Sequence, residues 1–459
     1  MTSLSTIFKD GTSKMKKSAI AGILLVIFVV LLFGFLFAAS EKVPLPRQST
    51  QSQIDQGKFN QDETLSLKES PYTFAHDVFV PSGVKLTIES GVKICFEHNV
   101  SLIINGSIKA IGTEDNWITF MSTNPTSDTW GTIRFTGGSS ESLEMEYSEI
   151  SNATKGISIE NGQGKTLIEN CNIHDNVACG LQLTSGESIY VRGNRIVHNG
   201  IGIIGAGSSR NDSNSRYPYD NYLSDIKLEA NLIAFNSLQG VKFFSVGKAI
   251  AQIQNISLAF NTISNNNGNG VEIFTNQGGM GVISDITFTS NSIENNGKNG
   301  VQINSFTAAD VIDFVYNISF FSNTVICNNQ SGVQIKSTVH QNNATYDATF
   351  SNNTFIGNDK AVLIDQGVTS KIEDNIIEGN VYGIFYNRTQ INVALDNNIS
   401  SNTFGIFVSE EALVQAQNNY WGDSTGPYHP YINPQGKGNP VNGAGNDLVF
   451  IPFLISFNR

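Results

Sequence analysis

A pattern of polar and apolar positions recurs along most of this chain. It reads Asn-x-Ile-x-x-Asn, with a Gly eight or nine residues after the first Asn. The first position of the pattern is occupied by Ser148, Cys171, Asn194, Asn231, Asn261, Asn291, Asn323, Asn353, Asn375, Asn397 and Asn419. Successive copies lie 22 to 37 residues apart. Repeats of this length predict a solenoid, in which each repeat stacks on its neighbours, rather than a globular domain.

Apolar residues hold three further fixed places in the pattern. One lies two residues after the first Asn, as at Ile263, and another follows the Gly, as at Val271. The third is a pair that precedes the Asn and alternates with a polar residue, as at Ile256 and Leu258, which is the spacing of a β-strand. Three short strands separated by polar turns make one coil of about 22 residues. We therefore expect an all-β fold, a right-handed parallel β-helix.

Stacking of coils explains why the same residue types recur. Parallel strands of neighbouring coils pair about 4.8 Å apart, so equivalent residues lie directly above one another. The apolar sets then fill the interior, and the Asn set can form a ladder in which each side-chain amide donates to the next. We expect Cys171 to be a small buried residue in this ladder.

An apolar segment precedes the repeats. Residues 18–39 form a run of 22 residues that is long enough to span a bilayer. Basic residues stand before it, at Lys9, Lys14, Lys16 and Lys17. The positive-inside rule therefore predicts a transmembrane signal-anchor, with residues 1–17 as a cytoplasmic tail. The alternative is a cleaved signal peptide, because Ala38 and Ser40 suit a cleavage site.

The remainder divides into two parts. Residues 40–71 are polar and lack periodicity, which predicts a stalk or linker, and residues 72–455 would form the β-helix with its C-terminal cap. We expect a single-pass membrane protein whose β-helix is extracellular, at the cell surface. Asn-x-Ser/Thr sequons permit a surface glycoprotein. The net charge of −12 argues against a nucleic-acid partner.

Both ends of the repeat region resemble known proteins. Residues 80–96 read Val-Pro-Ser-Gly-Val-Lys-Leu-Thr-Ile-Glu-Ser-Gly-Val-Lys-Ile-Cys-Phe and are similar to the opening coils of exported β-helix proteins. Residues 418–430 read Asn-Asn-Tyr-Trp-Gly-Asp-Ser-Thr-Gly-Pro-Tyr-His-Pro and resemble the closing motif of prokaryotic surface β-helix proteins, which include the NosD-like periplasmic family. The resemblance covers about residues 72–455. It implies the fold and no particular activity, because this family contains lyases, hydrolases, epimerases and adhesins.

The wide coils, in which the gap is 30 to 37 residues, carry extra segments between the strand after the Gly and the next coil. These segments are Ala206–Ser224, Ser245–Gln254, Asn276–Ser284, Ser305–Tyr316 and Ser337–Tyr346. Loops inserted at one place in successive repeats lie on one side of a solenoid, where they often form a binding face. The alternative is that they are surface excursions without function.

A row of Asp and Asn occurs only in the wide coils, six residues before the ladder Asn. Its members are Asp225, Asn255, Asp285, Asn317 and Asp347. One interpretation is a ladder of turns, since Asx side chains bond nearby backbone. The other is a strip that binds a cation or sugar hydroxyls. Beside it an outward polar stripe is expected at Lys227, Ser257, Thr287, Ser319 and Thr349.

Aromatic residues supplement this row. The segment before Asp225 contains Tyr217, Tyr219, Asp220 and Tyr222, a composition common in sugar sites, although a flexible loop explains it equally. The candidate ligand-binding residues are therefore Tyr217, Tyr219, Asp220, Tyr222, Asp225, Asp285 and Asp347. Phe385 and Phe407 are expected to be outward and stacked, as a sugar platform, a partner patch or a surface covered by the C-terminal segment.

The search for catalytic and metal motifs favours no enzyme class. There is no Gly-x-Ser-x-Gly elbow, and the Asn-Thr-Asp, Gly-His-Gly and Arg-Ile-Lys trio of polygalacturonase-like hydrolases is missing. Lyases of this fold need a base beside Ca²⁺-binding carboxylates, but Arg192 and Arg195 have only Glu187 near them in sequence. Possible soft metal ligands in adjacent coils are Cys171, His174, Cys179 and His198. Two of these four are expected to face inward, so we predict no metal site, and no cofactor apart from Ca²⁺ at the Asp/Asn row. Cys171 and Cys179 could also form a disulfide in an exported protein.

These observations lead to three hypotheses of function. The first is a membrane-anchored extracytoplasmic β-helix protein that binds surface polysaccharide or another envelope component, without catalysis. The second is a polysaccharide lyase, epimerase or hydrolase that acts at the wide-coil loops. The third is a structural stalk or adhesin.

Overall fold

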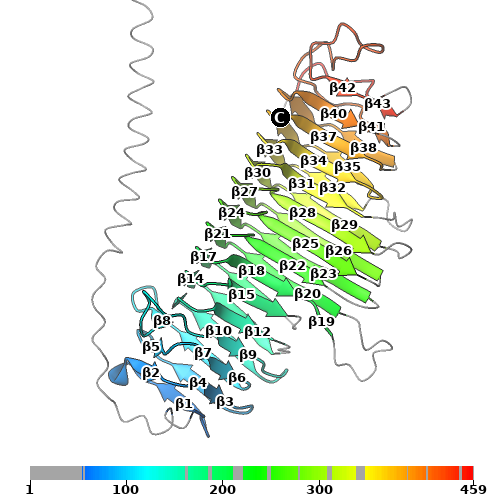
Figure 1. Ribbon diagram of the computed structural model, residues 1–459. Helices are drawn as coiled ribbons and strands as arrows, with labels where there is room; N and C mark the ends of the chain where they lie inside the picture. Colours follow the sequence, from blue (N-terminus) through cyan, green and yellow to red (C-terminus); the bar gives the residue numbers. More distant parts are fainter. Residues whose placement is uncertain are drawn as a thin grey trace, which may run out of the picture. The chain divides into compact units, whose positions relative to one another are not determined.

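The computed structural model describes residue 54 and residues 57–160, 164–184, 189–209, 221–245, 250–277, 280–307, 313–337, 347–389, 391–409, 412–443 and 447–457. These residues fold into three parallel β-sheets and one short 3-10 helix, η2 (Leu67–Glu69), with no α-helix among them. Each coil of the chain adds one strand to sheet B, then one to sheet C, then one to sheet A, so the sheets grow in parallel (Figure 1). The expected parallel β-helix is confirmed.

Each sheet is defined by its strands in spatial order. Sheet B contains β1 (Glu63–Leu65), β4 (Lys85–Ile88), β7 (Ser107–Ile111), β10 (Ser142–Glu146), β13 (Lys165–Glu169), β16 (Ile189–Arg192), β20 (Asn221–Glu229), β23 (Ile250–Ala259), β26 (Met280–Thr289), β29 (Asp313–Phe321), β32 (Ala348–Ser351), β35 (Ser370–Glu373), β38 (Ile391–Leu395), β41 (Leu413–Gln415) and β43 (Leu448–Val449), with β19 (Ser208–Ser209) antiparallel to β20. Sheet C contains β2 (Tyr72–Phe74), β5 (Lys93–Phe96), β8 (Ile118–Ser122), β11 (Ser148–Ser151), β14 (Asn172–His174), β17 (Arg195–Val197), β21 (Leu232–Ala234), β24 (Thr262–Ser264), β27 (Ser292–Glu294), β30 (Thr324–Ile326), β33 (Thr354–Ile356), β36 (Ile376–Glu378) and β39 (Asn398–Ser400). Sheet A contains β3 (Val78–Val80), β6 (Leu102–Ile104), β9 (Ile133–Phe135), β12 (Lys155–Ile159), β15 (Cys179–Thr184), β18 (Ile201–Ala206), β22 (Val241–Ser245), β25 (Val271–Gln277), β28 (Val301–Thr307), β31 (Ser331–Lys336), β34 (Lys360–Asp365), β37 (Tyr382–Asn387), β40 (Phe404–Val408) and β42 (Val441–Asn442).

The apolar columns fill the interior in the register that the repeats predict. In sheet C, Ile263 pairs with Ile293 and Ile293 with Val325, and all three side chains are buried. Sheet A stacks Val271 on Val301 in the same way. Because each strand is only a few residues long, its apolar side chains find most of their partners in the coils above and below. The stack, rather than the single coil, is therefore the cooperative unit.

Two Asn ladders run along the stack, one where each strand of sheet C begins and the other where it ends. The predicted ladder is formed by the first Asn of each pattern, and it is joined by the second Asn, five residues later. Asn261 and Asn266 both donate their side-chain amides to the Oδ1 atom of the equivalent residue in the next coil, over 3.0 Å in each case. Cys171 is buried in the first ladder, where its backbone N–H donates to Asn194 Oδ1 over 2.8 Å.

A residue in the left-handed backbone conformation precedes each ladder position in the regular coils. In one coil these are Ser290, with φ of 53°, and Asn295, with φ of 55°. Each turns the chain sharply at an edge of sheet C and brings the following Asn inward. The Gly of the pattern is required for another reason, because the backbone of the next coil lies too close to leave room for a side chain. A Cβ on Gly270 would lie 2.6 Å from the carbonyl oxygen of Gly300 in the next coil.

The extra segments of the wide coils are partly strand rather than loop, which corrects our expectation. Strands β20, β23, β26 and β29 begin inside the expected loops, and β25 and β28 extend into them. Leu223, Ile253, Ile283 and Val315 explain the difference, because their side chains are buried in these extensions. Sheets A and B therefore both continue past the edge of the narrow coils.

The stack begins ahead of residue 72, where we expected the β-helix to start. Strand β1 pairs with β4, and Phe59 is fully buried against the core. The described residues, from Ile54 onward, belong to one compact unit. The predicted anchor at residues 18–39 lies outside the described residues, as does the cytoplasmic tail. Within the described part of the chain, no helix is long and apolar enough to cross a membrane.

Candidate functional site

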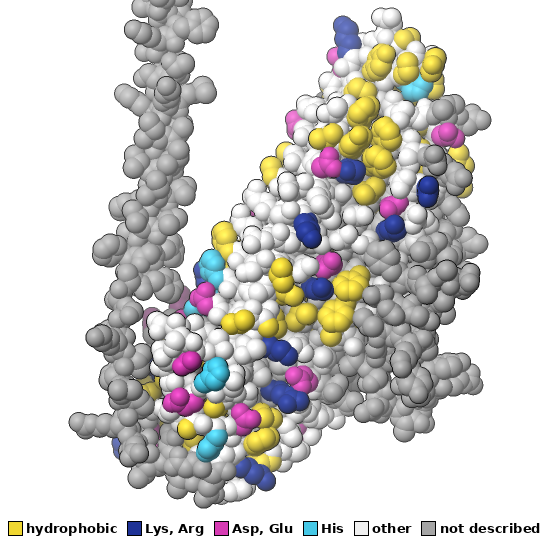
Figure 2. All heavy atoms as spheres, in the orientation of Figure 1, with side chains coloured by type: hydrophobic (Ala, Val, Ile, Leu, Met, Phe, Trp, Pro, Cys, Tyr) yellow, Lys and Arg dark blue, Asp and Glu magenta, His cyan; other side chains and the backbone are white. Residues whose placement is uncertain are grey.

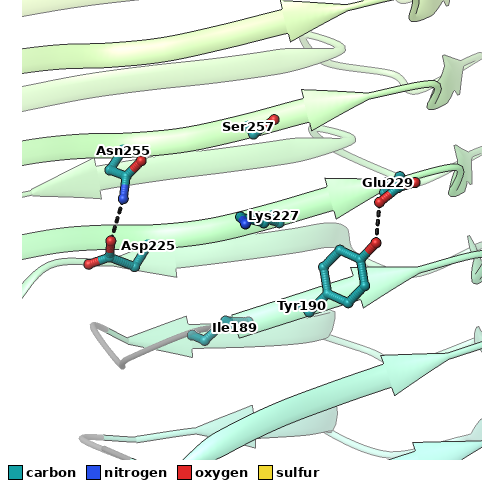
Figure 3. Close-up of a pocket in the computed structure, with 7 residues that line it drawn as sticks. All are labelled: Ile189, Tyr190, Asp225, Lys227, Glu229, Asn255 and Ser257. Carbon is teal, nitrogen blue, oxygen red and sulfur yellow. Dashed lines mark hydrogen bonds between the residues drawn. The ribbon is translucent and has the colours of Figure 1, made fainter.

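A cavity of about 440 Å³ opens on the outer face of sheet B, over β16, β20 and β23. Figure 3 shows its lining. The residues are Ile189, Tyr190, Asp225, Lys227, Glu229, Asn255 and Ser257. They come from the last narrow coil before the wide coils and from the first two wide coils. The site therefore lies at the point where the coils change width.

Alternation along one strand places three charged groups in this cavity. Asp225, Lys227 and Glu229 are two residues apart on β20, so their side chains share the outer face. The parallel register then stacks Lys227 between Tyr190 of the preceding coil and Ser257 of the next. Residues that are 37 and 30 positions apart in the sequence become neighbours through this pairing.

Glu229 is held by Tyr190, which donates its phenol hydrogen to Oε2 of the carboxylate. This hydrogen bond raises the pKa of Tyr190, with burial adding to it, because ionising the phenol beside the carboxylate is unfavourable. Tyr190 therefore remains a hydrogen-bond donor at neutral pH. Arg192, on the same strand, lies with Cζ 6.0 Å from the Tyr190 ring centroid and with Nη2 2.5 Å from Glu169 Oε1.

Asp225 accepts two side-chain hydrogen bonds. Asn255 of the next coil donates its amide to Oδ1, and Ser224 donates its hydroxyl to Oδ2 over 2.7 Å. Asp285 repeats the arrangement two coils away, with Asn317 as donor to Oδ1.

The Asp/Asn row lies inside strands β20, β23, β26 and β29, and Asp225 and Asp285 bond Ser and Asn side chains rather than the nearby backbone that a ladder of turns would use. Asp225, Asn255, Asp285 and Asn317 have φ between 53° and 61°, and each interrupts the pairing of its strand with the neighbouring strand. Asp347 is not part of this row. It is buried at the start of β32, where its Oδ2 accepts hydrogen bonds from the backbone and hydroxyl of Thr369 over 2.8 and 2.9 Å.

The tyrosine segment falls mostly outside the described residues, which is the case for Tyr217, Tyr219 and Asp220. Tyr222 lies in β20, where its backbone pairs with Ser208 and Gln252. Of the candidate residues, the structure therefore brings Asp225 into the cavity and places Asp285 further along the same face.

Sequence reasoning missed Tyr190 and Glu229, and it was wrong about Arg192. We expected no carboxylate cluster near Arg192, with Glu187 as the closest carboxylate, but Arg192 contacts Glu169, and the register pairs it with Glu229. The signal was present in the ladder. Glu169, Arg192 and Glu229 each stand two residues before the first position of their own repeat, so they share one outward column. Arg195 instead donates to Asn172 over 3.0 Å.

The cysteines and histidines of the adjacent coils lie apart from the cavity. All four cysteines are free thiols, and burial raises the pKa of Cys171 to about 12 and that of Cys179 to about 11. His174 is bound on both sides, by Asp175 over 2.6 Å and by Glu149 over 3.1 Å. Among the described residues, no group of three or more His, Cys, Asp or Glu side chains is arranged to hold a metal ion.

Phe385 and Phe407 are outward and stacked, with ring centroids 4.9 Å apart. Tyr382 and Phe404 form a parallel stack with centroids 5.4 Å apart, and Figure 2 shows hydrophobic side chains gathered over β37 and β40. These four side chains remain partly exposed, so the described C-terminal segment does not bury them. Rings that stack on one another present mainly their edges to solvent. This arrangement disfavours a platform on which a sugar would lie flat against a ring face.

Comparison with known proteins identifies the family. A model described as "Right handed beta helix region" matches residues 82–216, 110–346 and 284–426. The chain belongs to this family. No curated protein sequence matches it.

Solved structures with a similar fold share little sequence with this β-helix protein. The periplasmic alginate epimerase AlgG is 13% identical, with 72% of this chain and 83% of that chain covered and a TM-score of 0.40. The A-module of the Azotobacter vinelandii mannuronan C-5 epimerase AlgE4 is 13% identical, with 74% and 91% covered and a TM-score of 0.39. The Agl-KA catalytic domain is 12% identical, with 80% and 60% covered and a TM-score of 0.39.

Proposed function

We propose that this protein is a membrane-anchored, extracytoplasmic β-helix protein that binds a surface polysaccharide through the outer face of sheet B. The observation that carries the proposal is the cavity around Lys227, because it opens at one end of a continuous stripe of hydroxyl groups. Lys227 pairs in register with Ser257, and the stripe continues through Thr287, Ser319 and Thr349.

An extended polymer suits this surface better than a compact ligand does. Ser257, Thr287, Ser319 and Thr349 repeat at the coil spacing of about 4.8 Å, and each hydroxyl can donate and accept. A linear polysaccharide offers hydroxyls that repeat along one axis, so its successive sugars can meet equivalent groups. Affinity then comes from many weak contacts that engage together.

The geometry of the site favours binding over hydrolysis. The carboxylates of Asp225 and Glu229 are both engaged by neighbouring side chains, Asp225 by Asn255 and Ser224 and Glu229 by Tyr190. A glycosidase instead needs two carboxyl groups that flank the scissile bond, one of them as a proton donor. The raised pKa of Tyr190 also disfavours a phenolate base for elimination or epimerisation. Turnover of a bound oligosaccharide would nevertheless promote the enzyme hypothesis above ours.

The anchor is part of the proposal and rests on residues 18–39 and the lysines before them. We expect the intact chain in the membrane fraction, with the β-helix digested by protease added outside the cell. Soluble protein whose mature N-terminus lies near residue 40 would show a cleaved signal peptide instead.

Binding is tested with the full-length protein on a glycan array, followed by titration of the oligosaccharides that bind. Lys227→Ala and Tyr190→Phe should each weaken binding about five-fold or more, the loss of roughly one polar contact. Lys298→Ala is the matched control, because Lys298 is an exposed lysine of a wide coil away from the cavity. Binding that is unchanged in both cavity variants would place the site elsewhere.

A further inference from the structure

The charges that face this cavity do not suit an acidic ligand. Asp225 and Glu229 flank Lys227 on the same strand, each roughly 7 Å away along the backbone. The cluster therefore carries one positive charge between two negative ones. A ligand carboxylate that approached Lys227 would also approach both carboxylates of the protein.

On the outer face of sheet B, Lys85, Lys109 and Lys165 lie in coils before the cavity, and the cations at the two ends of the stripe are engaged. Arg192 contacts Glu169 over 2.5 Å, and Lys371, at the far end of the stripe, contacts Glu373 over 2.7 Å. Between these ends the stripe consists of neutral hydroxyls, with Asp285 the charged side chain beside it. Among the described residues that line the cavity, Lys227 is the one basic side chain, and it forms no ion pair.

We infer that this site selects neutral, hydroxyl-rich polysaccharides and discriminates against polysaccharides that carry a carboxylate on each sugar. The inference rests on the proposed function and names its ligand class. An acidic polymer along the stripe would place successive carboxylates against hydroxyls, Asp225, Glu229 and Asp285, with one cation to meet them all. Desolvating a charge without a counter-ion is unfavourable, whereas sugar hydroxyls need only the donors and acceptors that the stripe presents.

The matched probes are the hexamer of galacturonate and its fully methyl-esterified form. They share one backbone and differ in charge, so backbone fit cancels in the comparison. Isothermal titration of the full-length protein with both probes, at low salt, should show at least about ten-fold tighter binding of the ester. High salt should narrow the ratio, since it screens the repulsion.

Two isosteric variants assign the discrimination to the named carboxylates. Glu229→Gln retains an oxygen that can accept from Tyr190, and Asp225→Asn retains one that can accept from Ser224. Both variants should narrow the ratio between the affinities for the ester and for the acidic hexamer, because each should bind the acidic hexamer more tightly than wild type does. Glu294→Gln is the control, because Glu294 lies on sheet C and does not face the cavity.

The outcomes separate the two claims. Equal or tighter binding of the acidic hexamer would refute the selectivity while leaving polysaccharide binding intact. A ratio that favours the ester but does not change in Glu229→Gln and Asp225→Asn would also refute it, because other groups would then set the preference. If neither hexamer nor any glycan of the array binds, the proposed function fails, and the selectivity fails with it.

Discussion

Asn261 donates two hydrogen bonds to one atom, Oδ1 of Asn291 in the next coil. The distance to this oxygen is 2.9 Å from the backbone nitrogen of Asn261 and 3.0 Å from its side-chain nitrogen. The side-chain amide also donates to the Leu228 carbonyl of the preceding coil over 2.9 Å. One Asn side chain therefore joins three coils and satisfies backbone groups that the turn leaves without a partner in the sheets.

Removing one rung should be costly. Asn291→Ala deletes the acceptor of both Asn261 bonds and the donor to Leu258 and Asn323. Each buried group left without a partner costs about 1–3 kcal/mol, so we expect a loss of about 3 kcal/mol or more in the free energy of unfolding. Chemical denaturation monitored by circular dichroism measures it. Ser292→Ala, at the adjacent outward position, should change stability by less than about 0.5 kcal/mol. Equal effects of the two changes would show that the ladder contributes little.

Substitution at some exposed positions with a left-handed backbone conformation should increase the stability of the protein. Phe260 is 61% exposed and has φ of 58°, a conformation that a bulky residue adopts at a cost and Asn adopts more readily. Phe260→Asn should therefore stabilise the protein by about 1 kcal/mol. Phe321→Asn is the matched control, because Phe321 is also exposed but lies within strand β29. That change should be neutral or destabilising, since Asn is unfavourable in strands. Stabilisation in both variants would point to general surface polarity rather than to backbone strain.

The stack could be predicted from sequence because its rules are local and repeated. Ile263, Ile293 and Val325 each stand two residues after a ladder position, and one correct alignment of the repeats fixes the register of every coil. Errors arose where the chain departs from the repeat. The extensions of β23 and β26 escaped notice because Ile253 and Ile283 find partners only when neighbouring insertions pair with each other.

The cavity was only partly predictable for a related reason. Asp225 and Lys227 were identified because they belong to rows that recur in the wide coils. Tyr190 and Glu229 occur once each, and their contact joins a narrow coil to a wide one across 39 residues. A site that is built where the repeat changes width has no periodic signal of its own, although the ladder register would have placed its members in adjacent columns.

The stability of the protein should depend on pH through the protonation of His174. Burial lowers the pKa of this imidazole, but its hydrogen bonds to Asp175 and Glu149 outweigh burial and raise the pKa from 6.5 to about 9. A raised pKa in the folded state stabilises fully below pH 6.5, and this contribution is lost as the pH rises through about 9. His174→Gln should therefore melt below wild type at pH 6, by the equivalent of about 1–3 kcal/mol, and the gap should shrink between pH 6.5 and 9.

Glu149→Gln provides the companion measurement for His174. It removes one of the two carboxylates, so its melting temperature should also fall most at pH 6 and approach wild type above pH 9. The measurement is the melting temperature of wild type, His174→Gln and Glu149→Gln at pH 6, 8 and 10. A gap that stays constant over this range would mean that the ion pairs with His174 do not contribute to stability.

The direction of a bound polysaccharide can be tested by blocking the stripe in its middle. Thr287 is exposed on β26, one coil beyond Ser257, and Thr287→Trp would place a bulky ring across the path that we propose. A disaccharide held in the cavity around Lys227 should bind the variant as well as it binds wild type. A hexasaccharide should lose about ten-fold or more in affinity, because the sugars beyond the block can no longer engage together with the first ones.

Thr324→Trp is the matched control for this block. Thr324 is a partly exposed threonine in the coil after Thr287, but it lies on sheet C, so a ring there leaves the proposed path open. Surface plasmon resonance of both variants with the disaccharide and the hexasaccharide gives four affinities. The proposed binding path along the stripe is supported only if, of these four affinities, that of Thr287→Trp for the hexasaccharide alone is lower than in wild type. Loss of both ligands in Thr287→Trp would indicate a compact site that includes Thr287, and loss of the hexasaccharide in Thr324→Trp would move the binding path to sheet C.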